Sequence, residues 1–268
     1  MARKSFVKKY KNQLMVAVAI VLALLMLIPA WIRSGTGGTV VSLSELKKYV
    51  IVPKSENETL ILLFVGGPKE CPICPQVINN VTQAINIVKT QFEKQLNGTI
   101  VFKIIQCNGF PNCSNKQARI NVIWYKVPQV PILIIATNKL QVPIDPTGLG
   151  PDKLARLIVG WITVLKHAWL PPPTGKYVIY FYDDVHKSAL IDTIKAEALQ
   201  KGFKFVEMGC KQYPTNCTNT TVLSTMMLLG LRPQNLPFVM VIKNGKVVVA
   251  AMPTTFDQVN KILKALQN

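Results

Sequence analysis

Six cysteines carry the most reactive chemistry in this sequence, and they occur as three close-spaced pairs. The tightest is Cys71-Pro72-Ile73-Cys74, which follows an apolar run and opens a helical stretch. A thiol attacks a disulfide only as the thiolate, and the unpaired N–H groups at a helix start stabilise that charge. The spacing predicts Cys71 as an exposed nucleophile at the helix cap. It predicts Cys74, one turn deeper and half-buried, as the thiol that resolves a mixed disulfide.

Two other interpretations of this motif remain open. A Cys-x-x-Cys can be half of a zinc site, but the chain has no second such motif, and His167 and His186 lie in other contexts. The pair can also be a purely structural disulfide. Its placement after an apolar strand and at the start of a long helix favours redox chemistry over both. We therefore expect no metal and no cofactor beyond the Cys71–Cys74 disulfide itself.

The remaining cysteines lie at matching places in two halves of the chain. Each pair flanks a loop that follows a predicted strand: Cys107 with Cys113, and Cys210 with Cys217. We expect two structural disulfides, each stabilising its loop by about 2 to 3 kcal/mol. The alternative is a relay, in which one of these pairs exchanges electrons with the Cys-x-x-Cys.

The elements that position these cysteines occur twice in the same order: strand, helix, strand, cysteine loop, helix, β-hairpin and helix. In the first set we expect a strand at 59–65, a helix from 71, a strand at 99–105, the cysteine loop at 107–113, a helix ending near 125, a hairpin at 131–143 and a helix from 152. In the second we expect a strand at 177–182, a helix at 188–201, a strand at 203–207, the cysteine loop at 210–217, a helix at 221–229, a hairpin at 237–252 and a helix at 256–267. Asn244-Gly245 predicts a type I′ turn inside the second hairpin.

The second half has no Cys-x-x-Cys where the repeat would put one. His186, which follows Asp183-Asp184 there, is a candidate substitute base, although a loop role is the simpler interpretation.

Composition divides the chain into six parts. They are a basic tail (1–13), an apolar segment (14–32), a spacer with a short helix (33–58), a domain with Cys-x-x-Cys (59–169), a Pro-rich linker (170–175) and a second domain (176–268).

Residues 14–32 predict a transmembrane signal anchor. The segment is uncharged and about as long as the hydrocarbon core requires. A cleaved signal peptide is the alternative, but its apolar region would span only about 7 to 15 residues. The basic tail keeps the amino terminus in the cytoplasm and puts both domains on the extracytoplasmic side. The net charge of the chain is +18, and the basic residues outside the tail are spread among apolar ones. This spread argues against nucleic-acid binding.

The Asn-x-Ser/Thr acceptor pattern of N-glycosylation recurs along the predicted exported part. Its candidates are Asn57, Asn80, Asn97, Asn112, Asn216 and Asn219.

Several motifs resemble the thioredoxin-like superfamily. They are Ile61-Leu62-Leu63-Phe64 leading into the Cys-x-x-Cys, Val130-Pro131-Ile132-Leu133, and Leu236-Pro237-Phe238-Val239. Tandem units with Cys-Pro-x-Cys-Pro are similar to archaeal-type protein disulfide oxidoreductases and to glutaredoxin-like proteins. The resemblance implies an α/β fold of two tandem thioredoxin-like units, each with a mixed sheet flanked by helices, after one N-terminal transmembrane helix.

The resemblance also implies roles for single residues. A cis peptide bond before Pro131 would leave the Val130 backbone free to pair with an extended substrate, with Pro72 beside it. One family feature is missing, because strand 59–65 offers no buried acid beneath the resolving cysteine. Glu70 is the nearest acid, and we expect it to be exposed and to oppose thiolate formation.

Together these features predict a membrane-anchored, extracytoplasmic thiol-disulfide oxidoreductase acting on protein thiols and disulfides, near newly exported chains or a membrane electron-transfer partner. The alternative is a non-catalytic binding or chaperone-like surface protein of the same fold, with structural disulfides only. No motif encodes the direction of electron flow, the client or the oligomeric state.

Overall fold

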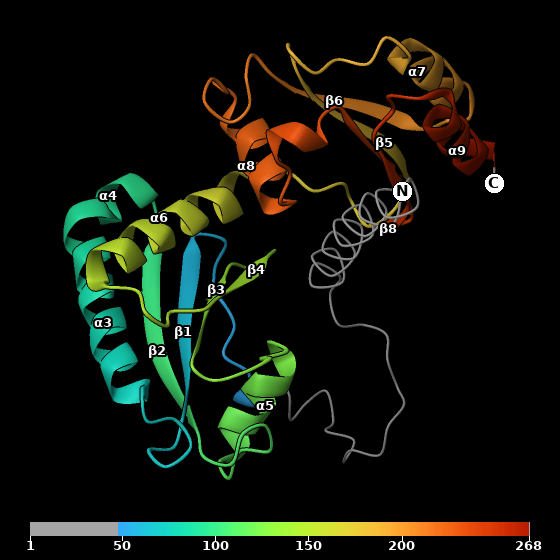
Figure 1. The fold of residues 1–268 in the computed structure, drawn as a ribbon. Helices are drawn as coiled ribbons and strands as arrows, with labels where there is room; N and C mark the ends of the chain where they lie inside the picture. The colour runs from blue at the N-terminus through green and yellow to red at the C-terminus, as the bar shows by residue number, and fades with distance from the viewer. Residues whose placement is uncertain (1–47, 268) are drawn as a thin grey trace, which may run out of the picture. The chain divides into compact units, whose positions relative to one another are not determined.

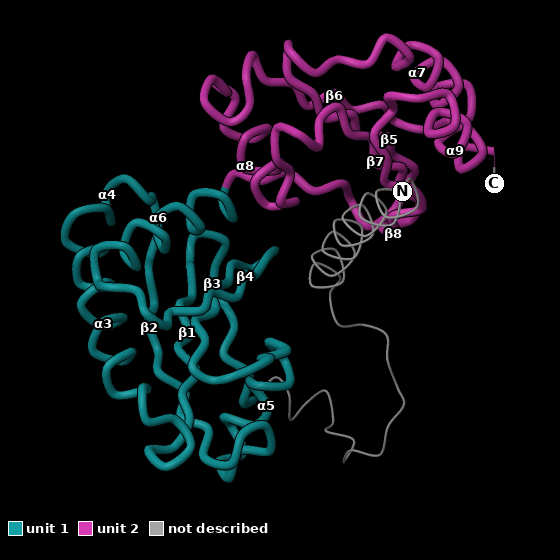
Figure 2. Tube along the Cα trace, viewed as in Figure 1, with its two compact units in different colours: residues 1–166 teal, residues 167–268 magenta. Residues whose placement is uncertain are grey.

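A computed structural model describes residues 48–267 (Figure 1). The chain divides into two compact units, residues 1–166 and 167–268 (Figure 2). The predicted basic tail, the anchor at 14–32 and most of the spacer lie outside the described residues. Between residues 48 and 267, no helix is long and apolar enough to cross a membrane.

The first unit contains one four-stranded sheet in the order β2-β1-β3-β4. β1 pairs in parallel with β2 and antiparallel with β3, and β3 pairs antiparallel with β4. The strands are β1 (Glu58–Gly66), β2 (Thr99–Cys107), β3 (Ile132–Ala136) and β4 (Gln141–Ile144). The helices are α3 (Cys74–Ile87), α4 (Glu93–Leu96), α5 (Lys116–Trp124) and α6 (Pro151–His167). A π-helical turn at Val88–Phe92, which the sequence did not predict, joins α3 to α4.

β1 is the centre of this unit, and every one of its nine residues is buried. A parallel strand that is covered on both faces reads as a continuous apolar run, as Leu60 to Val65 does. α3 and α5 lie on opposite sides of the sheet (Figure 1). Leu60, Leu62 and Phe64 belong to the core cluster that also contains buried residues of α5. Packing on both faces therefore fixes the end of β1, and this end determines where the residues after it begin.

The second unit repeats this topology with a sheet in the order β6-β5-β7-β8. β5 pairs in parallel with β6 and antiparallel with β7. The strands are β5 (Lys176–Asp183), β6 (Lys204–Cys210), β7 (Phe238–Lys243) and β8 (Lys246–Ala251). The helices are α7 (Ile191–Gln200), α8 (Thr220–Leu228) and α9 (Phe256–Gln267). The predicted tandem repeat of α/β units is thus confirmed for the described residues.

The β7–β8 hairpin turns at Asn244-Gly245, as its sequence predicts. Both residues have positive φ, 48° and 73°. A type I′ turn requires this conformation at both central positions, and asparagine and glycine adopt it at the lowest cost.

The Pro-rich segment is part of the second unit rather than a free linker. The Asn244 N–H donates to the Gly175 carbonyl at 2.8 Å. The Trp169 N–H donates to Thr225 Oγ1 at 2.9 Å. The division between the units falls between Lys166 and His167, a few residues before the expected linker at 170–175.

Candidate functional site

Cys71 and Cys74 form a disulfide at the start of α3, with 5.3 Å between their Cα atoms. The chain leaves β1 at Gly66 and turns tightly, since the Cys71 N–H donates to the Gly67 carbonyl at 2.9 Å. α3 begins at Cys74, and its cap is Ile73. The prediction that Cys71 sits at the helix cap was therefore wrong: Cys71 lies in the preceding turn, and its carbonyl accepts the Cys74 N–H at 3.1 Å.

Both cysteines are buried, at 3% exposure for Cys71 and 2% for Cys74. The expectation of an exposed Cys71 and a half-buried Cys74 was wrong for this oxidised state. The residues between them face solvent instead, and Ile73 is 44% exposed. The two bonded sulfur-bearing side chains thus lie on the inner side of the turn, and Pro72 and Ile73 form its outer surface.

The peptide bond between Val130 and Pro131 is cis, as the resemblance implied. Gly66 lies between Cys71 and Val130: a Cβ atom on Gly66 would lie 3.1 Å from Cys71 Cβ and 3.3 Å from Val130 Cγ2. Only a residue without a side chain leaves room for such a close approach on both sides. Residues about sixty positions apart in the sequence are thereby brought together at the end of β1. The sequence predicted only an open approach loop at Gly66-Gly67-Pro68 and not this close fit, although a glycine ending a buried strand is a recognisable signal.

Glu70 is exposed, as predicted, but it also holds two loops together. Its two carboxylate oxygens accept the Gly109 N–H at 2.8 and 2.9 Å. One of them also accepts the Gly67 N–H at 3.3 Å. Glu70 therefore connects the turn that carries Cys71 to the loop between Cys107 and Cys113.

The other two predicted disulfides are also formed, Cys107–Cys113 and Cys210–Cys217. Each loop contains a cis proline, at Phe110–Pro111 and Tyr213–Pro214, which the sequence did not predict. Each loop is also bound by a carboxylate at or shortly after the end of the central strand. In the second unit this acceptor is Asp183, the last residue of β5, which receives the Tyr213 N–H at 3.1 Å.

The second unit has a serine at the position that Cys71 occupies in the first. Gly66 pairs with Cys107, and Asp183 pairs with Cys210, so Asp183 corresponds to Gly66. Counting five residues onward reaches Cys71 in the first unit and Ser188 in the second. Ser188 is buried, and its hydroxyl donates to the Pro253 carbonyl at 2.5 Å. This position supplies a hydrogen bond rather than redox chemistry.

His186 is held by Asp183, with 2.8 Å between Nδ1 and Oδ1. Burial by itself raises the pKa of Asp183, but hydrogen bonds from the Tyr213 amide and from His186 outweigh it and leave this pKa below its ordinary value. The contacts of His186 thus serve the loop, in line with the simpler interpretation of its role.

No carboxylate lies beneath Cys74 among the described residues. The one buried acid of the first unit among the described residues is Glu58, at the opposite end of β1, a strand that spans roughly 26 Å at the rise of an extended chain. A buried thiol without a nearby base keeps its proton more strongly, because burial disfavours the thiolate.

The glycosylation candidates differ in accessibility. Asn80 is half-buried and donates from Nδ2 to the Leu149 carbonyl at 3.2 Å, so the atom that would carry a glycan is already engaged. The other five are exposed: Asn57, Asn97, Asn112, Asn216 and Asn219. Their modification stays a prediction. Over residues 48–267, no three His, Cys, Asp or Glu side chains gather in a way that could hold a metal ion.

No family model and no curated protein sequence matches this chain. Among solved structures, form II of human ERp44 is similar, with 14% identity, a TM-score of 0.34, and coverage of 90% of this chain and 60% of that one. The first two thioredoxin domains of Saccharomyces cerevisiae Eps1p match with 11% identity, a TM-score of 0.29, and coverage of 88% and 99%. Form II of ERdj5 matches with 12% identity, a TM-score of 0.29, and coverage of 84% and 31%.

The chain spans 60% of the length of the ERp44 form II structure that it resembles. At these identities and TM-scores, the fold assignment rests on the chain itself. The strand order, the mixed pairing of β1 and β5, and a cis proline before β3 and before β7 match the layout of two tandem thioredoxin-like units.

Proposed function

We propose that the first unit is a thiol-disulfide oxidoreductase that acts on protein substrates through Cys71 and Cys74. The observation that carries this proposal is the arrangement around Gly66, which is approached closely both by Cys71 and by Val130, the residue before the cis bond to Pro131.

The reaction is an exchange in two steps. In the reduced protein, the Cys71 thiolate attacks a substrate disulfide, forms a mixed disulfide and releases one substrate thiolate. The Cys74 thiolate then attacks Cys71 Sγ, which closes the Cys71–Cys74 bond and releases the second substrate thiolate. Two electrons pass from the protein to the substrate, and the reverse sequence oxidises a substrate dithiol.

The substrate would lie as an extended segment along Val130 and Pro131, with Pro72 and the exposed Ile73 beside it. Val130 is half-buried, and pairing through its backbone resembles the addition of a strand to a sheet. No side-chain recognition is required for this contact, so the site suits many protein thiols and disulfides.

The proposal includes an extracytoplasmic location and an anchor at residues 14–32. Its support is the uncharged apolar run after a basic tail, together with three disulfides that suit an oxidising compartment. Such an anchor would keep the site close to exported chains and to a membrane electron-transfer partner.

A second candidate function is favoured by the burial of both cysteines. A binding or chaperone-like module with three structural disulfides would also seal Cys71 and Cys74 from solvent. The two functions differ in whether Cys71 exchanges with a partner.

The deciding experiment is trapping with a Cys74→Ser variant. In the oxidoreductase, this variant accumulates mixed disulfides through Cys71, and mass spectrometry after proteolysis identifies the linkage. The Cys71→Ser/Cys74→Ser variant is the matched control and traps nothing. If Cys74→Ser leaves Cys71 free of partners while a reduced model peptide stays unoxidised by the parent chain, the binding module is the correct function.

A further inference from the structure

β8 ends the sheet of the second unit, and among the described residues it pairs only with β7. One row of its backbone N–H and C=O groups therefore has no strand beside it. Proteins usually protect such an edge with charges, proline or a very short strand. In the first unit, β4 is four residues long and contains Pro143. β8 has six residues, of which Lys246 is the only charged one, and no proline.

The two faces of β8 differ. Val249 and Ala251 pack against the core cluster under α9, and Val248 and Ala250 are exposed on the other face. A register irregularity lies opposite Val241 and Ile242, so the regular part of the edge begins at Val249. A strand added here would place alternate side chains beside α9 and beside the exposed apolar face.

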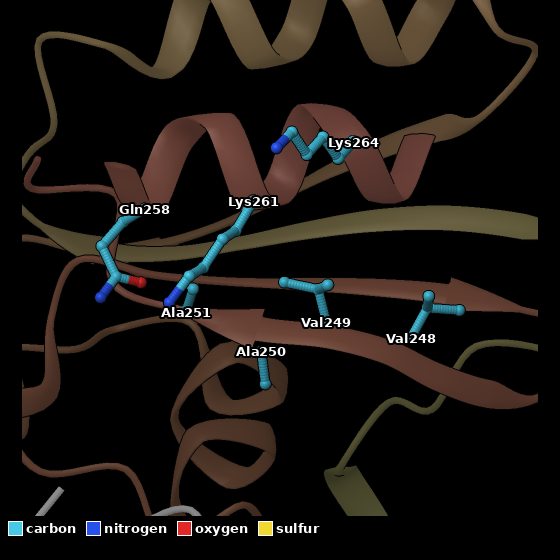
Figure 3. A pocket seen from close by; sticks show the side chains of 7 residues that line it. All are labelled: Val248, Val249, Ala250, Ala251, Gln258, Lys261 and Lys264. Carbon is cyan, nitrogen blue, oxygen red and sulfur yellow. The ribbon is translucent and has the colours of Figure 1, made fainter. Parts of the chain in front are cut away.

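A groove of about 480 Å³ runs between β8 and α9 (Figure 3). It is lined by residues 248–251 of β8 and by Gln258, Lys261 and Lys264 of α9. Figure 3 shows Lys261 extending from α9 toward β8. Neither lysine forms an ion pair with another residue in the described part of the chain. The α9 side of the groove is therefore cationic, and no acidic residue lines it.

The positive charge of these lysines favours some binding partners of the groove over others. A second copy of the chain would bring the same lysines and Lys246 against this edge, and like charges at close range are unfavourable. An acidic segment would pair with Lys261 and Lys264 instead. The unpaired backbone groups of β8 favour a polypeptide, because an extended chain satisfies a row of N–H and C=O groups.

We infer that β8 is a docking edge for an extended polypeptide segment in which acidic side chains, facing Lys261 and Lys264, alternate with apolar side chains, facing Val248 and Ala250. This surface belongs to the second unit, and it is independent of Cys71 and the proposed redox function. It gives the unit without a Cys-x-x-Cys a binding role of its own.

The test uses the full oxidised chain and fluorescein-labelled eight-residue peptides, with binding followed by fluorescence anisotropy. A peptide alternating Glu and Val binds at least about tenfold more tightly than one alternating Lys and Val. Lys261→Glu/Lys264→Glu weakens binding of the acidic peptide by at least about tenfold. Lys139→Glu/Lys211→Glu, a matched charge reversal at exposed lysines elsewhere, leaves it unchanged apart from a small effect of net charge.

Backbone pairing is tested by two further peptides, methylated on the amides of either the Glu or the Val residues. These two sets of N–H groups point to opposite edges of an extended peptide, so one version loses binding and the other keeps it. The inference is overturned if both methylated peptides bind like the parent, if the two charge reversals act equally, or if sedimentation shows a dimer that covers β8.

Discussion

Glu70 is the charged residue that most directly modifies the environment of Cys71. It precedes Cys71 in the chain, and its carboxylate is fixed by the Gly109 and Gly67 amides rather than free to turn away. A negative charge held near a thiol raises the cost of forming the thiolate. Lys69, the next residue back, is exposed and acts in the opposite direction.

Glu70→Gln is expected to make the Cys71 thiolate easier to form in the reduced protein, because it removes a negative charge held beside the turn that carries this thiol. The measurement is the pH dependence of iodoacetamide alkylation of Cys71 in a Cys74→Ser background. Lys69→Gln is the matched control and should make the thiolate harder to form. If both substitutions act in the same direction, a change in loop structure rather than charge controls this thiol.

Among the elements, the two cysteine loops share a construction that the strands impose. Each follows a strand parallel to the central one, is closed by a disulfide, and is bound by a carboxylate at or shortly after the end of the central strand. Because the acceptor in the first unit is Glu70, the Cys107–Cys113 loop also supports the turn that carries Cys71.

Cys107→Ser/Cys113→Ser is expected to reduce the free energy of unfolding by about 2 kcal/mol, since a short closed loop constrains the unfolded chain only modestly. Mixed-disulfide trapping through Cys71 should persist, because this pair has a structural role. Urea denaturation and the trapping assay provide the two measurements. Loss of turnover with the fold intact would instead support the relay between cysteine pairs.

Asp183→Asn is expected to destabilise the second unit by roughly 1 to 2 kcal/mol at pH 7, because a buried acceptor of three hydrogen bonds loses its charge. The pKa of Asp183 is lowered in the folded state, so its stabilisation is present above the unfolded pKa and disappears as the pH falls through the folded one. The difference in free energy of unfolding between Asp183→Asn and the parent, measured by urea denaturation, should therefore be smaller near pH 3 than at pH 7.

The neighbouring Asp184→Asn provides the control for this pH dependence. Asp184 is about half exposed and pairs with Lys187 at 2.8 Å, so its loss should cost less than about 0.5 kcal/mol. An equal effect of both substitutions would contradict the special role assigned to Asp183.

In the molecule as a whole, the two units share one topology but differ in the residues at the position of the Cys-x-x-Cys. The first contains the Cys-x-x-Cys and its cis proline, and the second has Ser188 at the corresponding place. The Pro-rich segment belongs structurally to the second unit, through contacts of Trp169 and Gly175.

A fragment of residues 167–268 is expected to be more stable than residues 176–268 by about 2 kcal/mol. The shorter fragment loses the hydrogen bonds between Trp169 and Thr225 and between Gly175 and Asn244, of which the two short ones contribute about 1 kcal/mol each. It also loses the edge contact between Trp169 and Tyr177. Thermal and urea denaturation of both fragments give the comparison. His167→Ala in the longer fragment is the control and should be neutral, since His167 is exposed. Equal stability of the two fragments would mean that 170–175 acts as a free linker.

Local patterns in the sequence determined most of the elements. The apolar run at Leu60 to Val65, the Asn244-Gly245 turn and the spacing of the three cysteine pairs each depend on neighbouring residues, and the structure has all of them. The cis bond before Pro131 came from the family resemblance, because a proline alone does not specify its isomer.

The tertiary structure decided what surrounds the reactive pair. Three features depend on residues that are distant in the chain. They are the burial of Cys71, the close fit of Gly66 between Cys71 and Val130, and the hydrogen bond from the Gly109 N–H to Glu70. Such contacts arise from the pairing of β1 with β2 and β3, which no local pattern fixes to within an ångström. The sequence thus defined which atoms can react, and the packing of the sheet defined how closely a partner can approach them.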